Sequence, residues 1–205
     1  MRRVLIMSSM HWHALVITLF KPFMAELSLE LNRKFYHPRA KAVSDASRAQ
    51  LRGLVRTFAH RRGFNGCGSS MQHMLTIVSN NALTEIDASK IRPVLNNAEE
   101  LSEQEAKSTV EDCVLALEKM GTDFYSAQAL LKVIQLRVRN MRLKLKPAAA
   151  SALSLVAGRG WVEDAYHNMR SQYPAEPGGK EVMRVDDVIR LEYEQFQNSN
   201  DDHET

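Results

Sequence analysis

The chain has 205 residues, 44% of them hydrophobic and 25% charged, with a formal net charge of +3, and these values are typical of a globular protein with one core. Cys67 and Cys113 are its only cysteines, which excludes the disulfide framework of a small secreted domain and a multi-thiolate zinc cage. Ten methionines and few aromatic residues favour helices over sheets. We therefore predict an all-α fold, an irregular multi-helix bundle.

The start of the chain resembles a secretion signal, because Arg2 and Arg3 precede an apolar stretch. His11 and His13 interrupt that stretch, and no small-residue cleavage site follows it. The longest uninterrupted apolar run, Ala14–Phe20, is far shorter than the roughly 20 residues that a membrane helix needs. We expect neither secretion nor contact with a membrane.

Val4–Phe20 is predicted to form a helix that is apolar on nearly all sides, which is typical of a central, buried element. Pro22 should end or kink this helix, so replacing Pro22 should mainly perturb folding. A buried helix so early in the chain suggests that a domain begins upstream of Met1.

Two further helices are predicted before Pro93. Arg39–Arg62 has apolar residues at a 3/4 spacing on one face, and Gly63 should end it. Ser69 or Ser70 can cap a helix that runs to about Ile86. Pro93 then marks a connection between helices.

A helical hairpin should follow. Ser102–Glu105 has the S-x-x-E pattern of a capping box and should open a helix that Gly121 ends. Thr122 or Asp123 should begin the next helix, which runs to about Leu145 and stops before Pro147. So short a turn predicts that the two helices pack antiparallel.

The last part of the chain gives weaker signals. Pro147–Gly160 looks like a linker or a weak helix, Pro174–Gly179 like a turn, and Val182–Phe196 like a final helix. We divide the chain into a helical domain at 1–146, a linker with weaker C-terminal helices at 147–196, and an acidic disordered tail at 197–205.

Charge is unevenly distributed. Leu31–Gly66 contains nine Lys or Arg against one acid, and Phe124–Lys146 contains six against none. Ala98–Glu118 and the last twenty residues each carry seven acids against one base. The basic segments either bind a polyanion or pair with the acidic helices of the same fold, and we favour internal pairing. For the basic run Leu136–Lys146, a solvated amphipathic face is favoured over a nuclear-import or nucleic-acid patch.

No pattern points to catalysis. His11 and His13 are two residues apart, so on a helix they face different directions and make a poor metal pair. Cys67 lies among Gly and Ser and is expected to be exposed, whereas Cys113 is expected to be a small core residue. We name no catalytic, cofactor-binding or metal-binding residue, and expect a protein that is not an enzyme.

Two phrases in the first third of the chain resemble a known family. The first consists of Ser9, Met10, His11, Trp12 and His13, followed by Lys21, Pro22 and Phe23. It resembles the closing part of the regulatory, or middle homology, domain of fungal zinc-cluster transcription factors, particularly of the nitrogen-assimilation type. That family carries leucine-His-x-x-Tyr-His and then Arg-Pro-Phe, so Ser9, Trp12 and Lys21 are departures. Trp12, His13, Pro22 and Phe23 are expected to be structural signature residues with roles in the core.

The second phrase consists of Leu51, Arg52, Leu54, Val55 and Arg56, followed by His60, Arg61, Arg62, Gly63 and Phe64. It is similar to the family's Leu-Arg-x-Leu-Val-Arg helix, which leads into Arg-His-Gly-Phe. The resemblance covers about Val4–Ile86 and is only compositional beyond it.

The resemblance implies that residues 1–146 are a helical regulatory domain of a nuclear transcription regulator, and its nitrogen-assimilation type implies a role in nitrogen metabolism. DNA would be bound only through an N-terminal cluster of six cysteines around two zinc ions, which this chain lacks. The implied partners are co-regulator proteins or a small-molecule effector, and a homodimer is a further option. Met71 and Met74 are suited to adaptable apolar contact with a partner, although we favour a role in filling the core for them. The alternatives are a helical adaptor unconnected with transcription and a hydrolase of unrecognised type.

Overall fold

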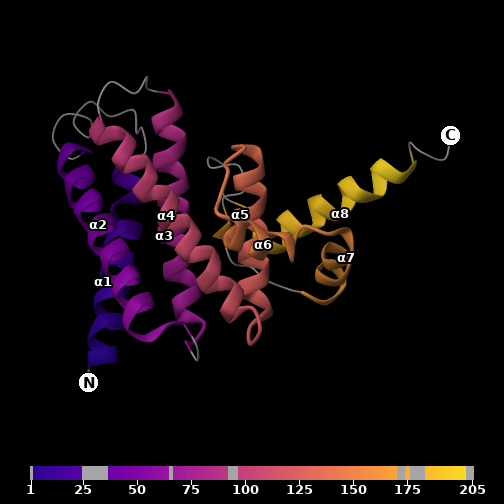
Figure 1. Ribbon diagram of the computed structural model, residues 1–205, viewed down its shortest axis with the longest axis horizontal. Helices are drawn as coiled ribbons and strands as arrows, with labels where there is room; N and C mark the ends of the chain where they lie inside the picture. The colour runs from indigo at the N-terminus through magenta and orange to yellow at the C-terminus, as the bar shows by residue number, and fades with distance from the viewer. Residues whose placement is uncertain are drawn as a thin grey trace.

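The computed structural model describes residues 2–24, 37–64, 67–91, 97–169, 174–175 and 183–201. These ranges form an all-α multi-helix bundle, as predicted, with eight helices and one pair of very short strands (Figure 1). The connection expected at Pro93 lies outside the described residues.

Most of the helices pack on a neighbour in the sequence. The helices are α1 (Arg2–Met24), α2 (His37–Arg62), α3 (Ser70–Ile91), α4 (Asn97–Met120), α5 (Tyr125–Asn140), α6 (Pro147–Ser154), α7 (Arg159–Asn168) and α8 (Val185–Asp201). Strands β1 (Pro174–Ala175) and β2 (Met183–Arg184) pair antiparallel. The closest packing is between α1 and α2 and between α3 and α4, while α5 to α8 gather on the far side of α4 from α1 (Figure 1).

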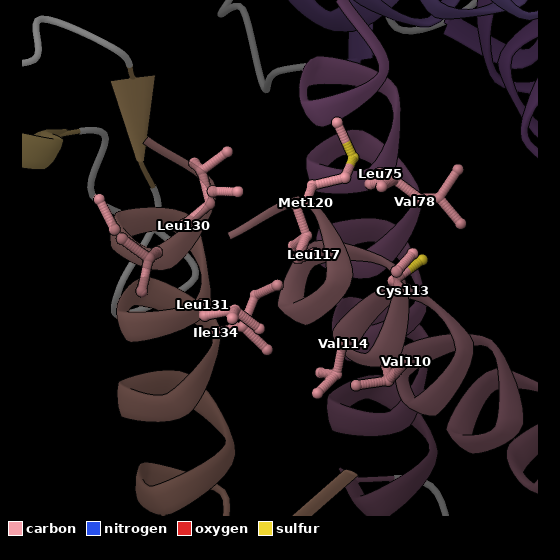
Figure 2. Packing of buried hydrophobic residues seen from close by; sticks show 14 of the residues in the cluster. Leu75, Val78, Val110, Cys113, Val114, Leu117, Met120, Leu130, Leu131 and Ile134 are labelled. Atoms are coloured by element: carbon pink, nitrogen blue, oxygen red, sulfur yellow. The ribbon is translucent and has the colours of Figure 1, made fainter. Parts of the chain in front are cut away.

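A continuous hydrophobic cluster runs through the bundle from α1 to α8. Near its centre, Leu131 and Ile134 of α5 point toward α4, which carries Val114 and Leu117, and Leu75 of α3 belongs to the same cluster (Figure 2). Each of these side chains is at most 1% exposed. Because α6, α7 and α8 also contribute buried residues, the described part of 147–196 shares this cluster with the earlier helices.

Helix α2 confirms the 3/4 pattern read from the sequence. Leu51, Val55 and Phe58 are buried on one face. Gly63 follows the last turn with φ +65°, and its N–H donates to the Ala59 carbonyl at 3.1 Å. This left-handed position favours glycine, so Gly63 ends α2 as predicted.

The two helices of the hairpin differ from the prediction mainly at their outer ends, and α5 begins at Tyr125 instead of Thr122 or Asp123. Helix α4 begins at Asn97, so the S-x-x-E pattern at Ser102 lies inside the helix and does not open it. Helix α5 ends at Asn140 instead of about Leu145, and Arg142 then adopts a left-handed backbone with φ 51°. Pro147 is the first residue of α6, where its missing N–H is no loss.

The C-terminal part is more helical than predicted. Of the two options for Pro147–Gly160, the structure shows a helix, α6, followed by a turn and the start of α7. Helix α8 continues to Asp201, so the prediction of disorder is wrong for 197–201, while 202–205 lie outside the described residues. The expected turn at Pro174–Gly179 begins with β1, and its remainder is not described.

Candidate functional site

Helix α1 carries a row of exposed apolar side chains. Leu5, Trp12, Leu15 and Leu19 are each 64–67% exposed and Phe23 is 44% exposed. Their separations of seven, three, four and four residues place them on one side of the helix. We call Leu5, Trp12, Leu15, Leu19 and Phe23 the α1 stripe. Apolar side chains that are exposed together in one patch can mark a binding surface, whereas single exposed apolar side chains are common on any protein.

The opposite side of α1 forms its contact with the fold. Met10, Ala14 and Ile17 are at most 6% exposed and belong to the hydrophobic cluster. The prediction of a central helix buried all round is therefore wrong, because α1 packs on α2 at the edge of the bundle (Figure 1). Helix α1 therefore has one apolar row on each of two opposite sides, and only the row of Met10, Ala14 and Ile17 is buried against the rest of the fold.

The core roles expected for the signature residues are also wrong in part. Trp12 and Phe23 belong to the exposed stripe, and Pro22 is exposed in the last turn of α1 without ending the helix. His13 is half-buried, and its Nδ1 is buried without a hydrogen-bond partner among the described residues. The sequence phrase that suggested a core element therefore contributes mostly to a surface.

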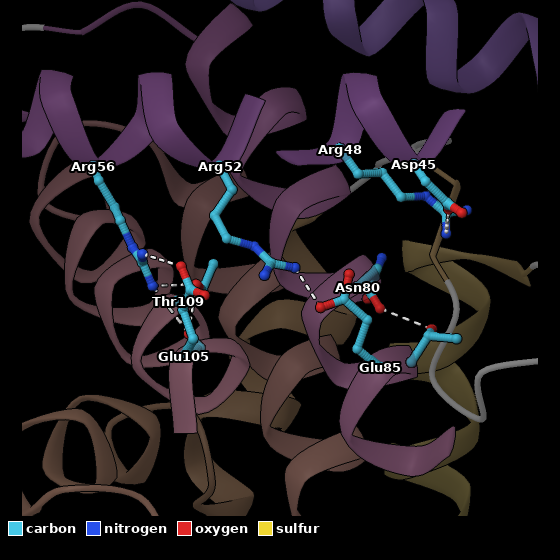
Figure 3. Close-up of polar contacts among 9 residues, drawn as sticks. Asp45, Arg48, Arg52, Arg56, Asn80, Glu85, Glu105 and Thr109 are labelled. Atoms are coloured by element: carbon cyan, nitrogen blue, oxygen red, sulfur yellow. Dashed lines mark hydrogen bonds and ion pairs between the residues drawn. The ribbon is translucent and has the colours of Figure 1, made fainter. Parts of the chain in front are cut away.

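Two arginines of α2 pair with acids of neighbouring helices, and Arg48 pairs with Asp45 of α2 itself (Figure 3). Arg52 forms an ion pair with Glu85 of α3. Arg56 reaches α4, where its Nη1 lies 2.6 Å from Glu105 Oε1 and its Nη2 donates to Thr109 Oγ1 at 3.0 Å. These contacts support internal pairing over a polyanion surface for α2.

The basic segment around α5 is paired in the same way. Lys132 and Arg139 both contact Glu192 of α8, and Arg137 donates to Thr84 Oγ1 of α3 at 2.8 Å. Lys146 lies beside the buried Glu111 of α4, which accepts from the Lys146 backbone N–H at 2.8 Å. Most basic residues of this segment therefore form contacts between helices of the same fold.

A cavity of about 320 Å³ opens between α5, the turn after it and α6. Its walls are mainly apolar and include Val138, Leu143, Leu145 and Leu153. Gln135, Arg139 and Arg142 also line it. No sequence pattern indicated this cavity, because its residues come from two helices and an irregular turn.

In the part of the chain that the structure describes, the thiols and histidines make no recognisable reactive group. Cys67 is 2% exposed, so its predicted exposure is wrong, and Cys113 is fully buried as predicted. Burial raises the pKa of the Cys113 thiol above its usual range, which disfavours the nucleophilic thiolate. The His11 ring hydrogen-bonds through Nδ1 to the Met7 carbonyl at 2.8 Å. Within the ranges described, no group of three His, Cys, Asp or Glu side chains can hold a metal ion.

No described helix has the combination of length and apolarity that crossing a membrane requires. Comparisons with protein-family models, with curated proteins and with solved structures found no match to this chain. The function is therefore inferred from the surfaces and contacts of the chain itself.

Proposed function

We propose that this chain is a non-enzymatic helical regulatory domain that acts by binding a helix of a co-regulator protein along α1. The α1 stripe is the observation that carries the proposal. It presents four large apolar side chains that are each 64–67% exposed, although the same helix already uses its other side to pack on the fold.

The spacing of the stripe favours a helix as the bound element. Leu5, Trp12 and Leu19 are separated by seven residues each, and Leu15 lies between the last two at three residues from Trp12 and four from Leu19. Repeats of three and four residues form the seam between paired helices, where each apolar side chain fits between those of the facing helix. An extended peptide, whose side chains alternate every second residue, would not match this row.

Charge restricts the partner further. Residues 2–24 contain no acid, and their basic residues lie near the two ends, at Arg2, Arg3 and Lys21. Two copies of α1 paired in either direction would bring only like charges together at the ends, which disfavours a homodimer through this face. The partner that fits is an amphipathic helix with an apolar seam and acidic residues at its ends.

Within this proposal, the chain is a regulatory domain like those of fungal zinc-cluster transcription factors, in the nucleus and with nitrogen metabolism as the pathway. The two sequence phrases support it: they lie on α1 and α2, which pack side by side. DNA recognition and its two zinc ions would belong to a cysteine cluster outside this chain. The proposal includes no catalytic step.

The test replaces the natural protein with a Leu15→Glu variant in the cells that express it. The matched control is Leu155→Glu, because Leu155 is 62% exposed and lies after α6, away from the stripe. We expect the untagged protein to be nuclear, and Leu15→Glu, but not Leu155→Glu, to alter transcript levels at unchanged protein abundance. A protein confined to the cytoplasm, with transcripts unaffected by its deletion, would instead favour the adaptor.

A further inference from the structure

The cavity between α5 and α6 combines an apolar interior with two guanidinium groups. Val138, Leu143, Leu145 and Leu153 supply apolar wall, and the volume is about 320 Å³. That volume lies at the lower end of the range for small-molecule sites, which are largely apolar with a few polar groups. The cavity therefore has room for a compact organic molecule and not for a folded segment of another protein.

Arg139 and Arg142 make the cavity a place for negative charge. The Arg139 side chain is 55% exposed, and its Nη2 lies 3.3 Å from Glu192 Oε1. Glu192 is also paired with Lys132, so its single negative charge is shared between two cations. The Arg142 side chain is exposed and forms no hydrogen bond or ion pair with the residues that the structure describes. The cations near the cavity thus exceed the acids.

Two local features also point to a ligand. The side-chain oxygen of Gln135, which lines the cavity, is buried without a hydrogen-bond partner among the described residues, and such atoms are usually satisfied. Arg142 adopts φ 51°, a conformation that glycine would take without strain. Binding of an anionic ligand by the Arg142 guanidinium group would explain why an arginine occupies this strained position at the edge of the cavity.

We propose that this cavity binds a small organic carboxylate with an apolar body. The carboxylate accepts hydrogen bonds from the guanidinium groups of Arg139 and Arg142, and the apolar body lies against Leu143, Leu145 and Leu153. The buried Gln135 oxygen accepts a hydrogen bond from a hydroxyl or N–H group on the body of the natural ligand. Glu192 holds the Arg139 guanidinium in place.

This site is separate from the α1 stripe. Helix α1 lies at one side of the bundle, and α5 and α6 lie on the other side of α4 (Figure 1). The inference goes beyond the proposed function and does not rest on it, because the cavity can bind a ligand whether or not α1 binds a helix. A mutation that abolishes binding of a helix along α1 should leave binding of the small ligand in the cavity intact, and the reverse should also hold.

Calorimetric titration of the purified chain tests the proposal with two pairs of probes: octanoate against octanol, and 3-phenylpropanoate against 3-phenylpropanol. Each pair shares an apolar body and differs in the carboxylate. We expect at least one acid to bind saturably at one site and at least tenfold more tightly than its alcohol. Arg142→Gln should weaken that acid about tenfold, because it removes a charged hydrogen-bond donor.

Two matched controls separate the site from general effects. Lys144→Gln removes the same charge from an exposed residue that does not line the cavity, and should change the affinity less than twofold. Ala150→Leu places bulk on the lining, whereas Ala148→Leu places it on an exposed part of α6 outside the lining. Only Ala150→Leu should abolish binding. If neither acid binds better than its alcohol, or if Lys144→Gln weakens binding as much as Arg142→Gln, the proposal is wrong.

Discussion

Lys132 Nζ on α5 lies 3.1 Å from Glu192 Oε2 on α8, with Lys132 fully buried and the Glu192 side chain 9% exposed. The other Glu192 oxygen contacts Arg139. Two buried charges are stable only as a pair, because each loses its hydration. This contact therefore ties the C-terminal helix to the centre of the bundle.

Removing the Glu192 charge should destabilise the protein. Glu192→Gln leaves the ammonium group of Lys132 buried without a full counter-charge, and we expect a loss of roughly 3 kcal/mol in the free energy of unfolding. Urea denaturation followed by circular dichroism measures it. Glu194→Gln is the control, since Glu194 is 56% exposed on the same helix and should change stability by less than about 0.5 kcal/mol. Equal losses in the two variants would show that the buried pair has no special role.

The same pair predicts a dependence on pH. Burial, aided by the charge of Arg139, lowers the pKa of Lys132 below its usual 10.5, although Glu192 opposes the shift. The unfolded chain then binds more protons than the folded one between the lowered pKa and 10.5, so stability contributed by Lys132 rises with pH in this window.

We therefore expect the free energy of unfolding of the natural chain to gain on that of Lys132→Met as the pH rises from about 8 to about 10. Tyr125, whose pKa is raised to about 12 by burial and a hydrogen bond to Asp164, is present in both proteins, so its own effect on stability cancels in the comparison. If the stability of the natural chain relative to that of Lys132→Met stays constant or falls over this range, the lowered pKa is contradicted.

Two glycines, one inside α2 and one at its end, should respond to alanine in opposite directions. Gly63 has φ +65°, where alanine is strained, so Gly63→Ala should cost about 1 kcal/mol. Gly53 lies inside α2 with open space where the methyl group of an alanine would lie, so Gly53→Ala should stabilise by about 0.5–1 kcal/mol. Thermal unfolding of the two variants gives the comparison, and a stabilising Gly63→Ala would refute the left-handed cap.

Replacement of Pro22 has a different expected result in the light of the structure. From the sequence alone, Pro22 should stop α1, and its loss should harm folding. In the structure, α1 continues to Met24 and Pro22 is exposed. A proline in a helix removes one hydrogen bond and crowds the preceding turn, so Pro22→Ala should leave the melting temperature unchanged or raise it. If Pro22→Ala instead lowers the melting temperature by several degrees, Pro22 does have the role in folding that the sequence predicted.

The helical class and much of α2 and α3 could be predicted from the sequence, because their apolar spacing and the Gly63 stop are local signals. The start of α4 was missed because a capping box is only one way to begin a helix. The end of α5 was missed because Arg142, with no glycine signal, takes a left-handed turn.

The candidate sites were harder to predict, for a physical reason. Helix α1 has apolar residues on two sides, and its sequence does not say which row packs on α2 and which stays exposed. The expected core role of Trp12 failed on this point. The cavity depends on how Leu143 and Leu153, from separate elements, are placed in three dimensions.

The central claim is that the α1 stripe binds a helix with acidic ends. We would measure binding of a designed amphipathic peptide, with leucines at the seam and glutamates at both ends, by its fluorescence anisotropy. We expect the natural chain and the Leu155→Glu variant to bind this peptide saturably and the Leu15→Glu variant not to bind it. A peptide with lysines at its ends should not bind the natural chain. Failure of the acidic peptide to bind, equal binding of the lysine peptide, or self-association of the chain through α1 would contradict the account.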